Sequence, residues 1–112
     1  MKETGQFHFL IVDDEVNIRK MLVICLETEG YQVTAVNNVD DALSEASRNS
    51  FDVAFVDLRL GTASGLDLIP ALLASTPLLK IIVITAYASI ETAVEAIKRG
   101  ATDYLPKPFT PS

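Results

Sequence analysis

The sequence predicts an α/β fold built on a doubly wound, five-stranded parallel sheet. Apolar runs typical of strands alternate along the chain with amphipathic stretches typical of helices, and the segments between them are short. The 112 residues are 49% hydrophobic and 21% charged, which is enough apolar material for one buried core. Strand, helix, strand units joined by short connections form parallel sheets with right-handed crossovers. We predict the strand order 2-1-3-4-5.

Five apolar runs are the predicted strands. Residues 7–12, 53–56 and 81–84 are almost continuously apolar and rich in aromatic and β-branched side chains. This pattern is typical of central strands that are covered on both faces. Residues 31–36 alternate between polar and apolar side chains, and residues 101–105 form a short run. These two segments are the predicted edge strands.

The first predicted helix carries apolar residues at the spacing of three and four that lines one helix face. Gly30 follows this run and is a natural helix end. Cys25 is the single cysteine, so we expect a buried packing thiol with no internal disulfide and no catalytic role. The residues expected on the buried face are Ile18, Met21, Leu22 and Cys25.

The second and third predicted helices begin at residues that favour the N-cap position. Asn38 would cap the second helix, with Asp41 three positions later, and Ser64 would begin the third. Pro70 lies inside the third helix and predicts a kink. The residues expected to face inward are Ala42, Leu43 and Ala46 in the second helix and Leu66, Ile69 and Leu73 in the third.

The fourth predicted helix runs from about Ser89 to Gly100. Its expected inward stripe consists of Ile90, Ala93, Val94 and Ile97. Thr110 and Pro111 form an N-cap and first-turn pair, which indicates a truncated fifth helix. We therefore expect residues 1–112 to be one domain from the N-terminal part of a longer protein. Apolar surface that this helix would cover favours self-association, for example as a homodimer, or exchange of elements between chains.

The charge balance narrows the classes of partner. A net charge of −6 and the lack of a basic cluster argue against direct binding of nucleic acid or of an anionic membrane by this segment. No apolar run approaches the ~20 residues that a membrane span needs, and residues 1–6 lack the features of a secretion signal. The sequence therefore favours a cytoplasmic protein that binds a divalent cation.

Chemically useful residues stand at the carboxyl ends of the predicted strands, where ligands bind in sheets of this type. Three carboxylates at one sheet edge repel one another and require a cation or a proton. Mg²⁺ is commonly held by one or two carboxylates with waters and phosphate oxygens, so this set suits Mg²⁺ better than zinc. The residues are Asp13 and Asp14 after the first strand, Asp57 after the third, Thr85 after the fourth and Lys107 after the fifth.

A carboxylate beside Mg²⁺ can attack a phosphorus centre and form an acyl phosphate. We expect Asp57 to be this nucleophile. Lys107 would then place a positive charge beside one phosphoryl oxygen, and the Thr85 hydroxyl would donate a hydrogen bond to another. Ala86 is small enough to leave the approach to Asp57 open. The pattern does not rank Asp13 against Asp14 as the closer metal ligand.

Five short motifs occur in the order and at the spacing of one known family. Each is weak alone, but five in this order and at this spacing are a strong signal. The motifs are Val12-Asp13-Asp14-Glu15, Val56-Asp57-Leu58, Ser64-Gly65-Leu66, Ile84-Thr85-Ala86 and Lys107-Pro108-Phe109. By these motifs the chain resembles the response-regulator receiver domains of bacterial two-component systems, and the resemblance covers essentially the whole chain.

The resemblance implies a role for each site residue. Asp57 would be phosphorylated by a sensor histidine kinase, and Asp13 and Asp14 would form an acidic pocket. Asp14 would be the more direct Mg²⁺ ligand, and the backbone carbonyl of Arg59 would be a further ligand. By the same resemblance the protein is a phosphoacceptor switch that assists its own phosphorylation and dephosphorylation, rather than an enzyme with a separate substrate.

The resemblance also implies a conformational switch. Thr85 would turn its hydroxyl toward the phosphoryl group, and the ring of Tyr104 would move inward behind it. The Lys107–Pro108 bond would be cis, and X–Pro is the bond type for which cis costs little. One departure is Leu60-Gly61-Thr62, where many members have a proline, so the geometry of this loop is not implied.

Residues 86–94 and 100–106 are most similar to receivers of nitrogen-regulator-type, enhancer-binding transcription activators. This similarity implies a C-terminal output domain, an ATPase with a DNA-binding part, whose transcription activation the receiver would control.

Two other functions share parts of this pattern. A metal-dependent phosphohydrolase of related topology would need an acid/base aspartate two positions after its nucleophile, where Arg59 stands. A flavodoxin-like binding module would have loops rich in glycine or hydroxyl groups at the strand ends. The first such loop here is instead Asp13-Asp14-Glu15.

Overall fold

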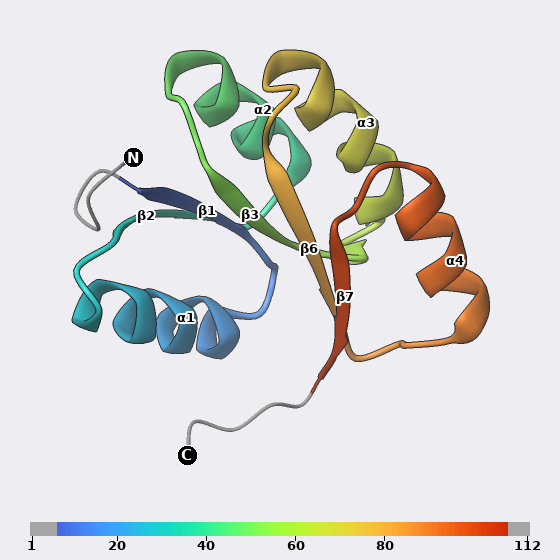
Figure 1. Cartoon of the computed structure of the whole chain (residues 1–112). Coiled ribbons are helices and arrows are strands. Elements are labelled where there is room, and N and C mark those ends of the chain that lie inside the picture. The colour runs from blue at the N-terminus through green and yellow to red at the C-terminus, as the bar shows by residue number, and fades with distance from the viewer. Residues whose placement is uncertain (1–6, 108–112) are drawn as a thin grey trace.

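A computed structural model of the chain describes residues 7–107 and shows a five-stranded parallel sheet (Figure 1). The strand order is β2-β1-β3-β6-β7, which confirms the predicted order 2-1-3-4-5. The central and edge positions of all five strands also agree with the prediction. The strands are β1 His8–Val12, β2 Gln32–Val36, β3 Val53–Asp57, β6 Lys80–Thr85 and β7 Asp103–Pro106.

Helices cover the two faces of the sheet unequally. Figure 1 shows α2 and α3 together on one face, with α4 beside β7, and α1 on the opposite face below β1 and β2. The main core lies on the side of α2, α3 and α4, where alternate residues of β1, β3 and β6, such as Leu10, Val56 and Ile81, are fully buried. The helices are α1 Val16–Thr28, α2 Val39–Arg48, α3 Gly65–Ser75 and α4 Ile90–Lys98. None of these helices is long and apolar enough to span a membrane.

The predicted starts of the second, third and fourth helices are confirmed, and that of the fifth, at Thr110, lies outside the described residues. The Asn38 side chain accepts a hydrogen bond from the backbone N–H of Asp41 at the start of α2. Ser64 caps α3 in the same way, and Ser89 caps α4. α3 continues through Pro70 to Ser75, and the kink there stays a prediction. Ala42, Ala46 and Ile69 are buried as expected, and Leu43, Leu66 and Leu73 pack against the core while partly exposed.

The predicted burial of Cys25 is wrong, because its side chain is exposed. α1 is the only described helix on its face of the sheet, and none of its residues is buried. Its half-buried line follows the i, i+4 row of Ile18, Leu22 and Leu26, with Met21 beside it. Cys25 lies off this row, so the helix rotation leaves its thiol in solvent.

The predicted inward stripe of α4 is also wrong, apart from the half-buried Ala93. Ile90 is 85% exposed, Val94 47% and Ile97 50%. α4 instead turns small side chains toward the rest of the domain, because Ala96 is its one buried residue. The spacing of apolar residues correctly predicted a helix here. It wrongly predicted that the helix face with Ile90, Val94 and Ile97 is buried.

A short hairpin follows β3 and was not predicted. Its strands β4 Arg59–Leu60 and β5 Ala63–Ser64 pair antiparallel. Gly61 lies in the turn with a φ of 65°, a left-handed conformation that favours glycine. The hairpin lies between Asp57 and the start of α3, so it borders the carboxyl end of β3.

Gly65 allows the chain to pass close behind Asp57. Its N–H donates to the carbonyl of Leu58 at 2.8 Å, and a Cβ at this position would overlap the backbone carbonyl oxygen of Asp57. A Cβ at Gly61 would meet nothing within 4 Å. The two glycines are therefore required for different reasons, close approach at one and backbone conformation at the other.

Gly65→Ala is expected to lower the free energy of unfolding by about 3 kcal/mol or more, because backbone rather than a flexible side chain must shift. Gly61→Ala is the matched control and should cost only about 1–2 kcal/mol of backbone strain. Urea denaturation of both variants measures the difference. Equal costs for the two would contradict the proposed close contact behind Asp57.

Candidate functional site

The carboxyl ends of the parallel strands form one edge where polar side chains collect. Asp13 and Asp14 follow β1, and Asp57 is the last residue of β3. One carboxylate oxygen from each of four acidic residues lies within 4.8 Å of the others. Asp13 is fully buried and Asp57 is 3% exposed. The four residues, called the acidic cluster below, are Asp13, Asp14, Glu15 and Asp57.

Lys107 is the cation that faces the acidic cluster. Its Nζ lies 2.8 Å from Asp13 Oδ2, 2.9 Å from Glu15 Oε1 and 3.1 Å from Asp57 Oδ2. Its backbone N–H donates to the carbonyl of Thr85 at 2.6 Å, which ties Lys107 to the end of β6. Burial alone would lower the pKa of Lys107, but its hydrogen bonds to Asp13 and Glu15 raise the pKa above the ordinary value. Lys107 is therefore charged at neutral pH.

Asp57 lies in a less favourable setting for a charged group. Burial raises the pKa of its carboxyl, and the nearby charge of Asp13 raises it further. Lys107 and the backbone N–H of Arg59, which is 3.4 Å from Asp57 Oδ1, oppose this shift only in part. The ionised form of Asp57 is thus incompletely compensated by the protein.

The donor set of the acidic cluster fits a hard divalent cation. Asp13 Oδ1 accepts the backbone N–H of Glu15 at 2.8 Å. Asp13 Oδ2 is buried and pairs with the Lys107 ammonium at 2.8 Å, and no other donor in the described part of the chain hydrogen-bonds it. A buried anionic oxygen with spare acceptor capacity, next to other carboxylates, suits Mg²⁺ or Ca²⁺.

Asp14 connects the cluster to the hairpin. Its Oδ2 accepts the backbone N–H of Gly61 at 3.1 Å, although the two residues are 47 positions apart. This contact and the part taken by Glu15 were missed by sequence reasoning. Glu15 could have been found, because it directly follows the aspartate pair. The Gly61 contact had no sequence signal, since it depends on how the hairpin folds back.

Thr85 and Tyr104 lie on the neighbouring strands β6 and β7 but do not hydrogen-bond each other. Thr85 is fully buried, and its Oγ1 accepts the backbone N–H of Tyr87 at 2.9 Å. Among the described contacts its hydroxyl is thus turned toward the loop after β6 and not toward Asp57. Tyr104 is half-buried, and its hydroxyl lies 2.6 Å from Thr92 Oγ1. Ala86 is exposed, as an open approach requires.

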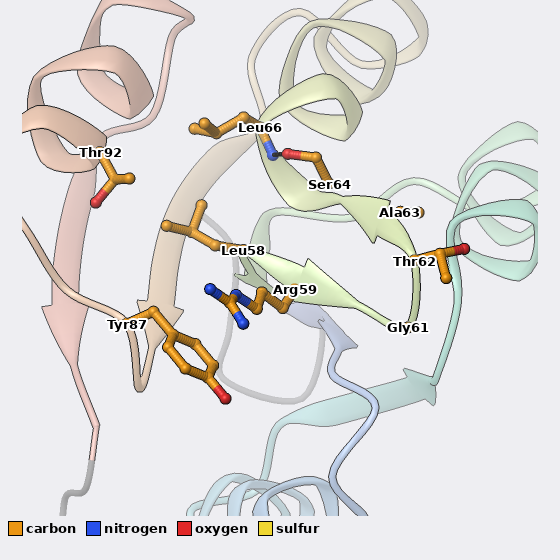
Figure 2. A pocket seen from close by; sticks show the side chains of 9 residues that line it. All are labelled: Leu58, Arg59, Gly61, Thr62, Ala63, Ser64, Leu66, Tyr87 and Thr92. Carbon is orange, nitrogen blue, oxygen red and sulfur yellow. Dashed lines mark hydrogen bonds between the residues drawn. The ribbon is translucent and has the colours of Figure 1, made fainter.

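Arg59 lies over the ring of Tyr87, with its guanidinium carbon 3.6 Å from the ring centroid. Figure 2 shows this pair along a cleft of about 440 Å³ that also borders the hairpin and Thr92. Arg59 and Tyr87 also line the smaller hollow over Asp57 and Asp14, so the two spaces share this pair as part of their lining. The role of the Arg59 carbonyl as a metal ligand stays a prediction. The Lys107–Pro108 bond lies outside the described residues.

Comparison with known proteins decides the family. A sequence model of the response regulator receiver domain matches residues 9–112. The chain belongs to this family. The receiver is therefore a signalling domain of two-component response regulators, and both the family resemblance and the fold class are confirmed.

Curated relatives are longer proteins. The receiver is 41% identical over 109 residues to the alginate biosynthesis transcriptional regulatory protein AlgB of Pseudomonas putida, covering 97% of this chain and 24% of AlgB. It is 38% identical over 105 residues to the transcriptional regulatory protein ZraR of Salmonella typhimurium, covering 94% of this chain and 24% of ZraR. The chain thus spans about a quarter of the length of these relatives.

Solved structures agree with this assignment. A response regulator from Burkholderia pseudomallei, crystallised with a phosphorylated aspartic acid, a calcium ion and citrate, matches with 44% identity and a TM-score of 0.90. The match covers 94% of this chain and 62% of that one. NtrX from Brucella abortus, in complex with ADP, matches with 35% identity and a TM-score of 0.85 over 92% of this chain and 24% of NtrX. These relatives confirm the resemblance to receivers of nitrogen-regulator-type transcription regulators.

In a chelator, Asp57→Asn is expected to raise the free energy of unfolding at neutral pH by about 0.5–2 kcal/mol. The physical reason is the raised pKa of Asp57, because ionisation of a group whose folded-state pKa is raised destabilises the fold. This penalty is present above the folded-state pKa and disappears as the pH falls below the unfolded value of about 3.9.

Urea denaturation of both proteins at about pH 7.5 and about pH 3.5 measures the change, on either side of that unfolded-state pKa. Asp40→Asn, at an exposed position in α2, is the control for loss of one negative charge. If Asp57→Asn were instead less stable than the wild type at neutral pH, Lys107 would overcompensate the charge of Asp57.

Proposed function

We propose that the receiver accepts a phosphoryl group on Asp57 from a sensor histidine kinase, in a reaction that depends on Mg²⁺. The observation that carries the proposal is the buried Asp57 carboxylate, held 3.1 Å from Lys107 at the edge of an all-oxygen acidic cluster. The phosphorylated aspartic acid in the Burkholderia pseudomallei relative supports this chemistry. We further propose that residues 1–112 are the N-terminal receiver of a longer regulator.

The metal would be held by carboxylates of Asp13, Asp14 and Asp57 and by the backbone carbonyl of Arg59. When bound, Mg²⁺ supplies positive charge that reduces the repulsion between an anionic carboxylate and an anionic phosphoryl group. The spare acceptor capacity of Asp13 Oδ2 supports this assignment. The calcium ion in the Burkholderia pseudomallei relative is also consistent with a divalent cation.

The chain's own groups would then act in sequence. A carboxylate oxygen of Asp57 forms a bond to phosphorus as the bond from phosphorus to the donor nitrogen breaks, and the donor leaves with that electron pair. Lys107 is already at hydrogen-bond distance from Asp57 and needs little movement to reach a phosphoryl oxygen. The Thr85 hydroxyl must first release the N–H of Tyr87 before it can donate to the phosphoryl group. The reaction thus couples Asp57 to the loop after β6.

The receiver on this proposal is a switch that assists its own phosphorylation and dephosphorylation, and not an enzyme with a separate substrate. Its conformational change would control an output domain of the same chain, an ATPase with a DNA-binding part that activates transcription. AlgB and ZraR, each about four times as long, support the presence of such a domain. We also propose that the protein is cytoplasmic and that it forms a homodimer.

A phosphohydrolase is less well supported by the geometry. The position two residues after Asp57 carries Arg59, whose guanidinium is stacked on Tyr87. The position where such an enzyme needs an acid/base carboxylate therefore carries the cationic side chain of Arg59, which contacts Tyr87. A flavodoxin-like binding role fits no better, because carboxylates rather than anion-binding loops surround the strand ends.

Incubation with acetyl phosphate and Mg²⁺ should add one phosphoryl group to the receiver, seen by intact mass. Neither the Asp57→Asn variant nor the wild type in a chelator should gain this adduct, because each lacks one of the two required groups. The Asp40→Asn variant should behave like the wild type. An equal adduct on the Asp57→Asn variant would falsify the assignment of Asp57.

Mg²⁺ should raise the thermal stability of the receiver, since a ligand that binds only the folded state stabilises it. At a concentration of about 100 times the Kd, the gain is about 2.7 kcal/mol. Asp14→Asn should lose most of this gain, whereas Asp40→Asn should keep it. Thermal melts with increasing Mg²⁺ provide the measurement, and a full gain in the Asp14→Asn variant would exclude Asp14 as a ligand.

A further inference from the structure

The start of α4 contains a hydrogen-bond network that reaches across to β7. The hydroxyl of Tyr104 lies 2.6 Å from Thr92 Oγ1 and accepts the backbone N–H of Ser89 at 3.3 Å. Thr92 Oγ1 is also 2.9 Å from Ser89 Oγ, and the Thr92 N–H donates to Ser89 Oγ at 3.1 Å. Ser89 and Thr92 form a capping box, so Tyr104 is bound to the residues that begin the helix.

Hydroxyl chemistry assigns the direction of the central bond. The Thr92 hydroxyl has one proton, and its oxygen lies 3.2 Å from the carbonyl of Ser89, to which it donates. One of its lone pairs accepts the backbone N–H of Ser89 at 3.3 Å, which leaves the other to accept the proton of the Tyr104 phenol. Tyr104 therefore donates to Thr92 and accepts from the Ser89 backbone. Both hydrogen-bonding functions of the phenol are used by the first turn of α4.

The ring of Tyr104 occupies an inner position. It is half-buried and packs against the main core, and its residue pairs with Val83 of β6. The family resemblance implies that this ring moves inward only after Thr85 turns toward a phosphoryl group. Thr85 still accepts the N–H of Tyr87 at 2.9 Å, so the hydroxyl has not turned. Tyr104 thus already has the position expected after phosphorylation, whereas Thr85 still has the orientation expected before it.

We propose that Thr92 is a positioning residue that holds Tyr104 in its inner position before phosphorylation. The inference rests on the proposed function, because it concerns the response to a phosphoryl group on Asp57. Activation then requires movement of Thr85 and of the loop that carries Tyr87, but little movement of Tyr104. A capping box needs only Ser89 and Thr92. The hydrogen bond between Tyr104 and the Thr92 hydroxyl is therefore not required for capping.

Three variants separate this role from helix capping. Thr92→Val keeps the shape of the side chain but removes the hydroxyl. Thr92→Ser keeps the hydroxyl and is the conservative rescue. Ser89→Ala weakens the cap of α4 but keeps Thr92 beside Tyr104. The chain has three tyrosines, Tyr31, Tyr87 and Tyr104, so labelling with 3-fluorotyrosine yields few ¹⁹F resonances, which Tyr→Phe variants assign.

Beryllofluoride with Mg²⁺ serves as the phosphoryl analogue in a ¹⁹F NMR titration. In the wild type the Tyr87 resonance should shift while that of Tyr104 changes little. Thr92→Val should move the Tyr104 resonance toward that of an exposed tyrosine before any addition, and should raise the beryllofluoride midpoint about two- to tenfold, the range for one net hydrogen bond. Thr92→Ser should match the wild type, and Ser89→Ala should lower thermal stability without changing the midpoint.

Two results would overturn the proposal. One is a large shift of the wild-type Tyr104 resonance on addition of beryllofluoride, which would show that the ring is not already in place. The other is an unchanged midpoint and Tyr104 resonance in Thr92→Val. Failure of the proposed function looks different, because the wild type would then neither bind beryllofluoride nor gain a mass adduct from acetyl phosphate. The Tyr104 resonance of the metal-free variants tests the Thr92 contact even in that case.

Discussion

The ion pairs of Lys107 with the carboxylates at the ends of β1 and β3 are the interaction on which the site depends. The loop after β1 and the end of β3 bring four acidic side chains together, and their mutual repulsion opposes folding. Lys107, which follows the last strand, reaches three of these residues at 2.8–3.1 Å. Its charge offsets part of the repulsion but leaves Asp57 with a raised pKa. The negative charge that remains favours binding of a divalent cation, whose positive charge would also offset that of a phosphoryl group.

The strand order makes this arrangement possible. In the order β2-β1-β3-β6-β7, β1 and β3 are neighbours, so their carboxyl ends place Asp13 and Asp57 side by side. Gly65 lets α3 begin directly behind Asp57, and Asp14 binds the hairpin tip at Gly61. The acidic cluster is therefore linked to the hairpin by one hydrogen bond, from the N–H of Gly61 to Asp14. It is linked to the end of β6 by Lys107, whose Nζ pairs with the carboxylates and whose backbone N–H donates to the carbonyl of Thr85.

α4 joins the site to the surface of the domain. Its first turn holds Tyr104 through Thr92, while its larger apolar residues, Ile90, Val94 and Ile97, remain exposed. The small buried contact of α4, centred on Ala96, means that little packing energy opposes a shift of this helix. The hydrogen bonds among Ser89, Thr92 and Tyr104 are therefore important for holding α4 in its position. On the proposal above, phosphorylation of Asp57 would instead act through Thr85 and the loop that carries Tyr87, while this network stays in place.

The sequence by itself determined the strands, the N-caps at Asn38, Ser64 and Ser89, the strand order and the residues that meet at the sheet edge. These features follow from local signals, namely apolar runs, side-chain caps and polar residues at strand ends. Only the tertiary structure decided that Cys25 and the stripe of Ile90, Val94 and Ile97 are exposed, because burial depends on helix rotation and on neighbouring elements. It also decided the contacts of Lys107 with Glu15 and of Tyr104 with Thr92, since these join residues 92 and 12 positions apart whose side chains meet only in the folded chain.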